Sequence, residues 1–386
     1  MSQSADPSTQ EIRISADSHV SEQPDLWQKM LPPRFRDRAL QFPRIRLGRA
    51  NHARPGGWDP VARLKDMAAD GIAAEVLYPT LAKSIYEQYT ETGDVELAKV
   101  SDRVYNDWMI EFCSEAPHRL WGQAHIGLWD MDYAIGEMER TKKEGLKGVT
   151  LWIAPPEHLP WTTDHYERFW SACEDMDVPV SMHINSGFGA SSTRRGEERF
   201  ATVSRQAYGH KVVAMQTVAE LILSGVFERH PRLKLVLAEF ECGWIPFYLE
   251  DLDRKFGRGR DLGLTMLPSE YFSQSISATF MEDGVGGFLM QRWGADNFMF
   301  ANDYPHPGGI WPHTDDAVAL TLSQVSEETR AKVLRENVAK LYHQPIPRPM
   351  PRTTTDFKDE DVEWRRPWLK KRGEFTFDKP QMGLAV

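Results

Sequence analysis

Residues that can bind a metal ion stand at the ends of several apolar runs in this chain. Asp17 and His19 end the first run, His183 ends another, and Glu239 and Asp303 follow two later ones. Imidazole nitrogens and carboxylate oxygens together suit Zn²⁺, Mn²⁺ or Fe²⁺. A set of this size leaves coordination positions open, which a catalytic metal requires. The pattern therefore predicts a divalent metal site, provided that the fold brings these side chains together.

Each of these residues has another explanation when it is taken alone. A histidine at a strand end is often an ordinary hydrogen-bonded residue, and Asp303 could cap a following helix. Glu239 could bind a metal directly, or it could hold a ligand in place by a hydrogen bond. Glu241 and His210 could also join Glu239 in a second metal site. The metal prediction depends on the combination, because the residues end separate apolar runs.

The apolar runs alternate with helical patterns over most of the chain. Runs that are apolar on both faces and separated by helices are typical of parallel strands with helical crossovers. Eight such units favour a closed (β/α)8 barrel, and an open doubly wound sheet is the alternative. The predicted strands are Ile12–Asp17, Ala73–Tyr78, Trp121–Leu128, Gly148–Ile153, Val178–His183, Leu233–Glu239, Ser275–Phe280 and Phe298–Ala301. The predicted helices include Ala62–Gly71, Val95–Cys113, Asp132–Glu144, Tyr166–Met176, Val212–Arg229, Gly284–Arg292 and Glu327–Tyr342.

This fold would gather the polar strand ends at one place. In a parallel barrel the carboxyl ends of the strands meet at one mouth, where the active sites of such enzymes lie. Residues i and i+2 of a strand face the same side, so Asp17 and His19 are expected to point together.

The chain divides into three predicted parts. Residues 1–11 read as a polar tail, residues 12–344 as the barrel, and residues 345–386 as a C-terminal arm rich in aromatic and charged residues. The aromatic content of the arm favours packing on the barrel or on a neighbouring subunit, with a disordered tail as the alternative.

Composition excludes several classes of protein. The 386 residues carry a net charge of −10, which disfavours partners such as nucleic acids and anionic lipids. No apolar run reaches the roughly 18–20 residues of a membrane span. The three cysteines show no metal or disulfide spacing, and the N-terminus shows no secretory pattern, so we expect a cytoplasmic protein.

Several short motifs occur in a fixed order between residues 12 and 343. They are Ala16-Asp17-Ser18-His19-Val20, Gly57-Trp58-Asp59-Pro60, Met182-His183, Ser224-Gly225-Val226-Phe227-Glu228-Arg229-His230-Pro231, Gly243-Trp244-Ile245-Pro246, Pro268-Ser269-Glu270-Tyr271 and Asn302-Asp303-Tyr304-Pro305-His306-Pro307. Together they resemble the amidohydrolase superfamily, in the amidohydrolase-related branch that includes aminocarboxymuconate semialdehyde decarboxylase and aromatic acid decarboxylases.

The resemblance implies a distorted (β/α)8 TIM-like barrel with loop insertions and a C-terminal extension. It also implies a divalent metal at the barrel mouth, with His19, His183 and Asp303 at the family's ligand positions. Asp17 stands where the decarboxylases often have His or Glu, and it remains a competent oxygen ligand. Glu239 is a larger departure, because much of the superfamily has a histidine at the end of strand six.

Further site candidates surround these ligands. Glu22, in the loop after the first strand, could contact the metal or substrate, or it could fix the loop. Arg63 could anchor a substrate carboxylate or form a structural ion pair, and Trp58 could wall the pocket. His306 follows Asp303 by three residues and, with His210, could act as an acid or base.

The resemblance implies a hydrolase or a carbon–carbon lyase (decarboxylase) that acts on a small organic acid. In hydrolysis the metal would supply hydroxide at neutral pH, and Asp303 or His210 would accept the proton of the water. In decarboxylation a protein acid such as Glu239 or His306 would protonate the carbon that loses CO2.

Other readings of the same residues stay open. A carboxylate-rich site with two Mn or Fe ions would suit an oxygenase, and a barrel with a structural zinc would suit a non-catalytic subunit. We expect zinc as the cofactor, with Mn or Fe, and one ion or two, as alternatives. We also expect a small-molecule substrate and a homo- or hetero-oligomer.

Overall fold

A computed structural model describes residues 10–39, 54–86, 88, 93–187, 209–258 and 261–354 of the chain. Most of the predicted N-terminal tail and of the C-terminal arm, and large parts of the loops 20–60 and 184–212, lie outside these residues. In the described part of the arm, the backbone carbonyl of Arg348 accepts hydrogen bonds from the Arg119 guanidinium. None of the helices in the described ranges combines the length and the apolar character that a membrane span needs.

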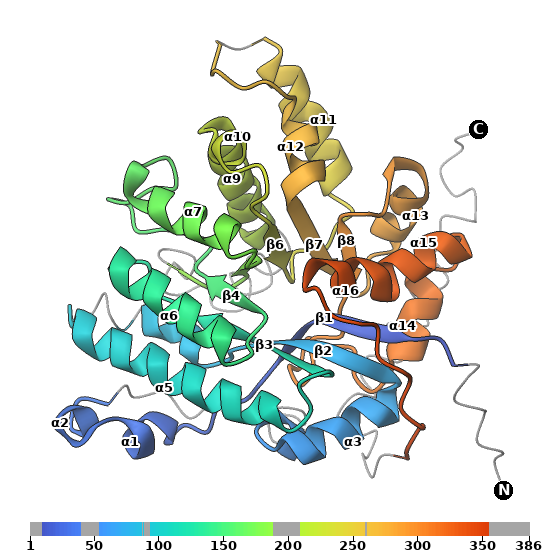
Figure 1. The fold of residues 1–386 in the computed structure, drawn as a ribbon. Helices are drawn as coiled ribbons and strands as arrows, with labels where there is room; N and C mark the ends of the chain where they lie inside the picture. The colour runs from blue at the N-terminus through green and yellow to red at the C-terminus, as the bar shows by residue number, and fades with distance from the viewer. Residues whose placement is uncertain are drawn as a thin grey trace, which may run out of the picture.

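Eight parallel strands form one sheet in which each strand pairs with the next along the chain (Figure 1). The sheet lies at the centre and the helices lie around it, which confirms the predicted (β/α)8 barrel. The strands are β1 (Arg13–His19), β2 (Ile72–Tyr78), β3 (Leu120–His125), β4 (Gly148–Leu151), β5 (Val180–His183), β6 (Leu235–Ala238), β7 (Ile276–Phe280) and β8 (Phe298–Phe300).

The helices that surround the strands are amphipathic or short. They are α1 (Leu26–Met30), α2 (Pro33–Arg36), α3 (Pro60–Asp70), α5 (Val95–Ser114), α6 (Met131–Lys143), α7 (Glu167–Asp175), α9 (His210–Leu223), α10 (Val226–Arg229), α11 (Ile245–Phe256), α12 (Pro268–Ser275), α13 (Gly284–Trp293), α14 (Thr314–Thr321), α15 (Glu327–Ala331) and α16 (Asn337–Leu341). Short helical turns are η3 (Pro55–Gly57), η4 (Ala82–Ser84), η5 (Asp164–Tyr166) and the π-turn η7 (Lys332–Glu336).

Two predicted helices are interrupted in the structure. The segment predicted as one helix over 212–229 divides into α9 and α10 at Gly225, whose φ of 78° lies in the left-handed region. Glycine adopts this conformation without the steric cost that a side chain imposes, so the chain turns there. The segment 327–342 contains the π-turn η7 between α15 and α16.

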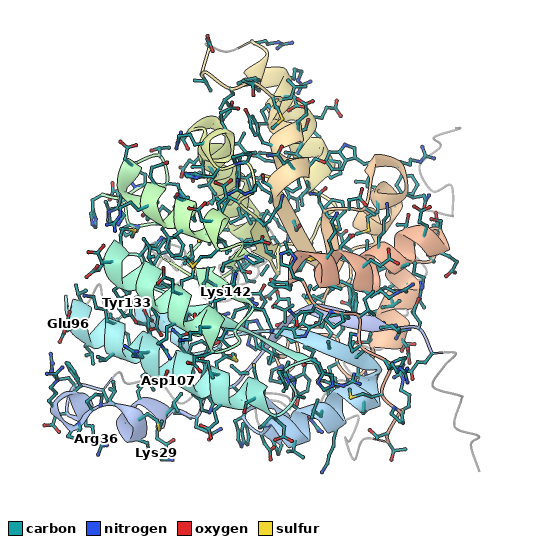
Figure 2. All side chains as sticks on the ribbon, in the orientation of Figure 1. Lys29, Arg36, Glu96, Asp107, Tyr133 and Lys142 are labelled. Atoms are coloured by element: carbon teal, nitrogen blue, oxygen red, sulfur yellow. The ribbon has the colours of Figure 1, made fainter. Side chains whose placement is uncertain are left out.

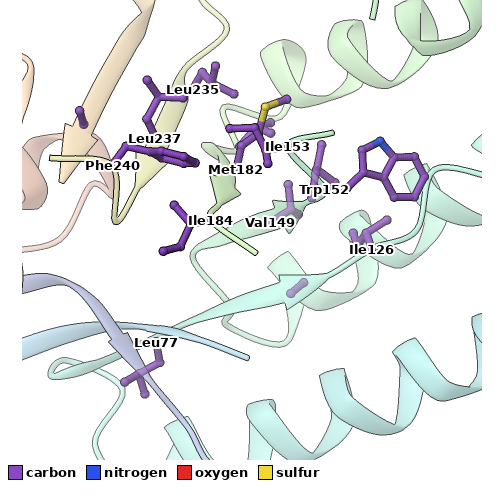
Figure 3. Packing of buried hydrophobic residues seen from close by; sticks show 14 of the residues in the cluster. Leu77, Ile126, Val149, Trp152, Ile153, Met182, Ile184, Leu235, Leu237 and Phe240 are labelled. Carbon is purple, nitrogen blue, oxygen red and sulfur yellow. The ribbon is translucent and has the colours of Figure 1, made fainter. Parts of the chain in front are cut away.

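The strands are buried on both faces, as crossovers on a parallel sheet require. One face packs against the helices, where Leu77, Val149, Met182 and Leu237 are buried (Figure 3). The other face fills the barrel interior with a separate cluster. That cluster contains Ile14, Ala16, Ala74, Val76, Tyr78, Trp121, Val236, Ala238 and Met299, and Val338, Ala339 and Tyr342 from the last helical segment.

The outer faces of the helices carry the charge. Glu96 and Asp107 on α5 and Lys142 on α6 are exposed and project outward from the barrel (Figure 2). Helices with one apolar stripe and one charged face stabilise a barrel because they bury the outer surface of the strands and leave the charges hydrated.

Strand β1 contains an irregularity just before the predicted ligands. Ser15 pairs with Glu75 and Ser18 pairs with Leu77, so β1 has one residue more than β2 in this interval. A bulge of this kind changes which side chains face inward. As a result Ala16 belongs to the interior cluster while Asp17, the next residue, also reaches the site at the barrel mouth.

Hydrogen bonds at the mouth of the barrel join the end of β1 to the segment that follows β8. The Asp303 amide donates to the Asp17 carbonyl over 2.9 Å, and the His19 amide donates to the Tyr304 carbonyl over 2.6 Å. These bonds bring residues that are almost 290 positions apart in the sequence into one small volume.

Candidate metal centre

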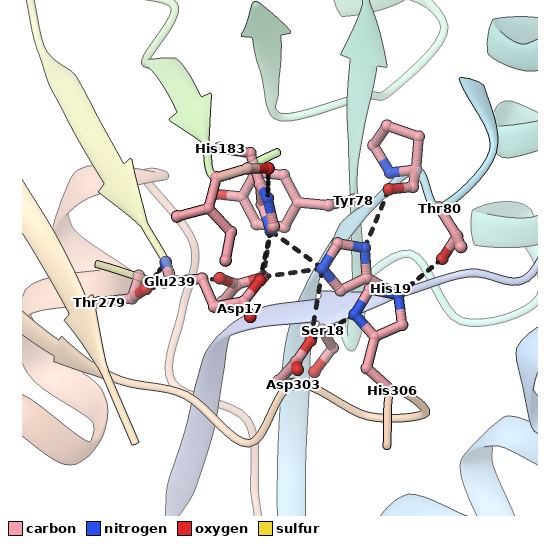
Figure 4. Close-up of polar contacts among 12 residues, drawn as sticks. Asp17, Ser18, His19, Tyr78, Thr80, His183, Glu239, Thr279, Asp303 and His306 are labelled. Carbon is pink, nitrogen blue, oxygen red and sulfur yellow. Dashed lines mark hydrogen bonds and ion pairs between the residues drawn. The ribbon is translucent and has the colours of Figure 1, made fainter. Parts of the chain in front are cut away.

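Side chains from four strand ends converge at the barrel mouth (Figure 4). The Nε2 atoms of His19 and His183 are 3.0 Å apart. Asp17 Oδ1 lies 3.5 Å from the first of these atoms and 3.4 Å from the second. Asp303 Oδ1 lies 3.4 Å from His19 Nε2, and Glu239 Oε2 lies 3.5 Å from His183 Nε2. The structure therefore brings together all five residues that the sequence predicts as metal ligands.

The hydrogen bonds of the two histidines define their tautomers. His19 Nδ1 is 2.9 Å from the Pro79 carbonyl, and His183 Nδ1 is 2.9 Å from the Ile184 carbonyl. A carbonyl oxygen only accepts hydrogen bonds, so each Nδ1 carries the proton and each Nε2 presents a lone pair. Burial lowers the pKa of both imidazoles, which favours these neutral forms.

Two lone pairs at 3.0 Å repel each other unless a cation lies beside both. Two ligands held about 2.1 Å from one ion at a right angle are about 3.0 Å apart, so the spacing matches a shared divalent metal. Asp17 Oδ1 supports the same reading, because it is buried and none of the described residues donates a hydrogen bond to it. The residues present therefore fit a divalent cation.

Glu239 reaches this site through an unusual backbone conformation. It follows Ala238, whose side chain lies in the barrel interior, so regular alternation would turn Glu239 toward the helices. Its φ is 67°, in the left-handed region, and its amide donates to Thr279 Oγ1 over 2.7 Å. This conformation is costly for a residue with a long side chain, and such strain is concentrated at functional sites.

The convergence of carboxylates also shifts a pKa. Burial, followed by repulsion from Asp303 and Asp17, raises the pKa of Glu239 well above its usual value. A cation among the three carboxylates would remove this repulsion.

His306 stacks on His19 with a ring-centroid separation of 3.8 Å and contacts a second ligand. Its Nδ1 lies 2.9 Å from Asp303 Oδ1, and its Nε2 lies 3.0 Å from Thr80 Oγ1. The Thr80 hydroxyl donates its proton to the Val20 carbonyl over 2.6 Å, so it accepts from His306 Nε2. With Nε2 protonated, Nδ1 presents a lone pair to Asp303 Oδ1, so this contact needs a proton or a cation beside it, and His306 shares metal-binding spacing with His19, Glu239 and Asp303.

Glu22 fixes the loop after β2. Its carboxylate accepts hydrogen bonds from the amides of Thr80, Leu81 and Ala82, at distances of 3.1, 2.9 and 3.0 Å. The residue is 2% exposed. These contacts favour the loop-fixing role for Glu22, and its contact with metal or substrate stays a prediction.

This loop carries two residues that the sequence analysis did not single out, Thr80 and Lys83. Lys83 Nζ lies 3.4 Å from His183 Nδ1. Both residues follow the apolar run of β2 within five positions, so the strand-end rule applied to β2 would have found them.

Arg63 lies behind the site, in a position that does not match a substrate-binding role. It is fully buried, and its Nε donates to Glu75 over 2.5 Å. Its Nη1 donates to the His19 carbonyl over 2.7 Å, and its guanidinium stacks 4.3 Å from the Tyr304 ring. Of the two roles left open for Arg63, these contacts favour the structural ion pair, because both partners lie in the protein interior, and substrate anchoring stays a prediction.

Other predicted residues stay outside the cluster. His210 is buried at the start of α9, and Glu241 accepts a hydrogen bond from the Met281 amide over 3.1 Å. Among the described residues neither one joins the groups with metal-binding spacing, and a second metal site with Glu239 stays a prediction. Trp58 is partly buried at the end of η3.

Comparisons with known proteins agree with this architecture. The profile of the amidohydrolase family matches residues 16–344. A gamma-resorcylate decarboxylase from Rhizobium sp. (strain MTP-10005) is 24% identical over 298 residues, which cover 72% of this chain and 86% of that protein.

Solved structures show the same fold at low sequence identity. An amidohydrolase from Mycobacterium avium subsp. paratuberculosis K-10 superposes with a TM-score of 0.69 at 21% identity, covering 86% of this chain and 98% of that one. A dihydroxybenzoic acid decarboxylase from Polaromonas sp. JS666, with bound manganese and the inhibitor 2-nitroresorcinol, gives a TM-score of 0.63 at 19% identity and covers 86% and 96%.

These comparisons favour neither the oxygenase nor the non-catalytic subunit, and they confirm the predicted enzyme class. The family profile begins within β1 and covers the rest of the barrel, including all four strand ends that carry the cluster. The chain belongs to the amidohydrolase family.

Proposed function

We propose that this enzyme is a divalent-metal-dependent decarboxylase of a small aromatic acid. Asp17, His19, His183 and Asp303 would hold the metal, and Glu239 would stand beside it. The observation that carries the proposal is the pair of unprotonated Nε2 atoms 3.0 Å apart with a buried carboxylate oxygen within 3.5 Å of both.

The relatives support the aromatic acid as substrate. The Rhizobium relative is named for gamma-resorcylate and the Polaromonas structure for dihydroxybenzoic acid, and the second holds manganese. Manganese therefore stands beside zinc as a candidate metal for this chain, and its site of nitrogen and carboxylate oxygen ligands accommodates either.

The residues around the cluster would bind and move protons. When bound, the metal would withdraw electron density from a carboxylate and an adjacent oxygen of the substrate. A proton held between His306 Nδ1 and Asp303 Oδ1, which are 2.9 Å apart, would place a proton donor at the mouth. Departure of CO2 leaves electron density on the ring carbon, and this pair would deliver the proton to it.

Thr80 would keep the His306 ring in one orientation. Its hydroxyl is committed to the Val20 carbonyl, so it presents only a lone pair to His306 Nε2. The imidazole is thereby held with its Nδ1 edge toward Asp303, the orientation that proton transfer requires.

Hydrolysis of a carboxylic ester or amide is a second candidate, and Glu239 favours it. The strand-six residue is a carboxylate in place of a histidine, and its Oε2 lies 3.5 Å from His183 Nε2. A carboxylate in this position would accept the proton of an attacking water molecule.

The test starts with metal analysis of protein purified without chelators or metal-binding tags. Protein reconstituted separately with Mn²⁺ and Zn²⁺ is then offered 2,6-dihydroxybenzoate and 5-carboxyvanillate, with CO2 release measured, alongside their methyl esters, with acid release measured. We expect one ion per chain and CO2 release. Ester cleavage alone would favour hydrolysis, and no bound metal after reconstitution would refute the proposal.

The matched variants are His183→Ala in the cluster and His118→Ala on the surface. His118 is exposed, so its replacement should change neither metal content nor rate. His183→Ala should lose both, because a metal ligand is removed.

A further inference from the structure

The loop after β2 places a lysine next to the metal cluster, on the far side of one ligand ring. Lys83 Nζ lies 3.4 Å from His183 Nδ1, whereas the cluster lies at the Nε2 atom of the same imidazole. The ammonium group therefore stands at the edge of the site without occupying the position of the ion.

The position of this lysine is built into the fold. The three amides of Thr80, Leu81 and Ala82 are tied to the buried carboxylate of Glu22, and the turn η4 (Ala82–Ser84) follows directly. A lysine on a flexible loop would have no defined place, but this one begins from a backbone held by three hydrogen bonds.

Lys83 has no carboxylate partner among the residues that the structure describes. Its nearest polar neighbour among them is His183 Nδ1 at 3.4 Å, and because that nitrogen carries a proton it accepts none of the three donors of the ammonium group. A charge in this position is stabilised when an anion binds beside it.

A divalent metal at the cluster makes the need for an anion stronger. The ion and the ammonium group would stand on opposite sides of the His183 ring, and like charges repel at this range. Lys83 is partly exposed, so a ligand at the mouth can reach it. The anion that enters must offer oxygen atoms, because an ammonium group donates hydrogen bonds and does not accept them.

We propose that Lys83 binds an anionic oxygen of the substrate beside the metal centre and so selects organic anions over their neutral analogues. This inference rests on the proposed function for the identity of the site, and it concerns which ligands bind rather than which bond breaks. Lys83 is on this account a substrate-binding residue, held in place by Glu22.

The experiment measures binding, so that it does not depend on turnover. Manganese-loaded enzyme is titrated calorimetrically with 2-hydroxybenzoate and with its neutral counterpart, 2-hydroxybenzamide. The variants are Lys83→Met, which keeps the length of the side chain, and Lys83→Gln, which keeps a hydrogen-bond donor without the charge. Lys29→Met is the matched control, because Lys29 is exposed on α1.

We expect the original chain and Lys29→Met to prefer the anion. Both Lys83 variants should lose about tenfold or more in affinity for 2-hydroxybenzoate, as expected for the loss of a charged hydrogen bond. Their affinity for 2-hydroxybenzamide should stay within about twofold. Metal content by elemental analysis and the thermal transition should match those of the original chain.

Three results would overturn the inference. The first is an equal loss of affinity for the anion and the amide, and the second is no loss of affinity for either. The third is loss of the bound metal in the Lys83 variants, which would make Lys83 a structural support of His183. If Lys83→Met fails to fold, Lys83→Gln decides. Anion binding that depends on Lys83 without any CO2 release would refute the proposed reaction and leave this inference intact. CO2 release by the original chain, with unchanged anion binding in both Lys83 variants, would refute this inference and leave the proposed reaction intact.

Discussion

Replacement of Arg63 by methionine tests whether this residue supports the metal centre from behind. The substitution keeps much of the aliphatic stem and removes the guanidinium. The guanidinium pairs with Glu75 at 2.5 Å, with both side chains at most 1% exposed, and donates to the His19 carbonyl. Breaking a buried ion pair from one side costs about 3–5 kcal/mol, because the other charge stays buried and uncompensated.

We therefore expect the free energy of unfolding to fall by about 3–5 kcal/mol at pH 8. Burial already raises the pKa of Glu75, and the charge of Arg63 has the largest effect among those that lower this pKa. Without Arg63 the pKa of Glu75 rises further. At a pH above this raised pKa, the ionised Glu75 carboxylate destabilises the fold. The loss of stability should shrink as the pH falls toward the unfolded-state value of about 4.5.

The assay is urea unfolding of metal-free protein at pH 5 and pH 8, together with metal titration. Loss of the bond to the His19 carbonyl should weaken metal binding by about 10–100-fold, the usual effect of removing a group that orients a ligand. The control is the double variant Arg63→Met with Glu75→Gln, which leaves no buried charge and should recover part of the stability. Normal stability and metal affinity with a raised KM would refute this reasoning and restore a substrate-anchoring role.

Three further predictions follow from other contacts. His183→Ala should abolish metal-dependent thermal stabilisation, which amounts to about 2.7 kcal/mol at a free metal concentration 100 times Kd in the original chain; persistence of that shift would contradict the ligand assignment. Burial raises the pKa of Asp70 to about 7, so its contribution to stability is present below the unfolded value of 3.8 and is lost as the pH rises through about 7. Asp70→Asn should flatten the stability-versus-pH curve between these values by up to about 4 kcal/mol, and an unchanged slope in urea unfolding would count against it. Thr80→Val should lower kcat more than it raises KM by releasing the His306 ring, and an effect on KM alone would contradict this role.

Much of the fold is readable from the sequence because its signals are local. A buried parallel strand is an apolar run with a polar end, and His19, His183 and Asp303 end three such runs. The strand-end rule therefore located these candidates before any coordinates. The spacing of apolar residues located several of the longer helices, but α11 and α14 were not among those predicted. The interruption at Gly225 was harder to place, because a glycine inside a helical pattern does not by itself end the helix.

The tertiary structure decided which polar residues meet. Glu239 reaches the cluster only because its backbone adopts a positive φ, and Asp17 only because β1 carries an extra residue against β2. Arg63 left two readings open in the sequence, and the choice depended on Glu75, a residue on a different element.

The sequence alone therefore determined the alternation of strands and helices, and with it the edge of the barrel at which chemistry occurs. The tertiary structure added Lys83 and Thr80 to the surroundings of the metal ligands. The physical reason is that strand ends are set by local hydrophobic pattern. The distances among side chains from β1, the loop after β2 and the segment after β8 are instead set by closure of the barrel, which no local pattern encodes.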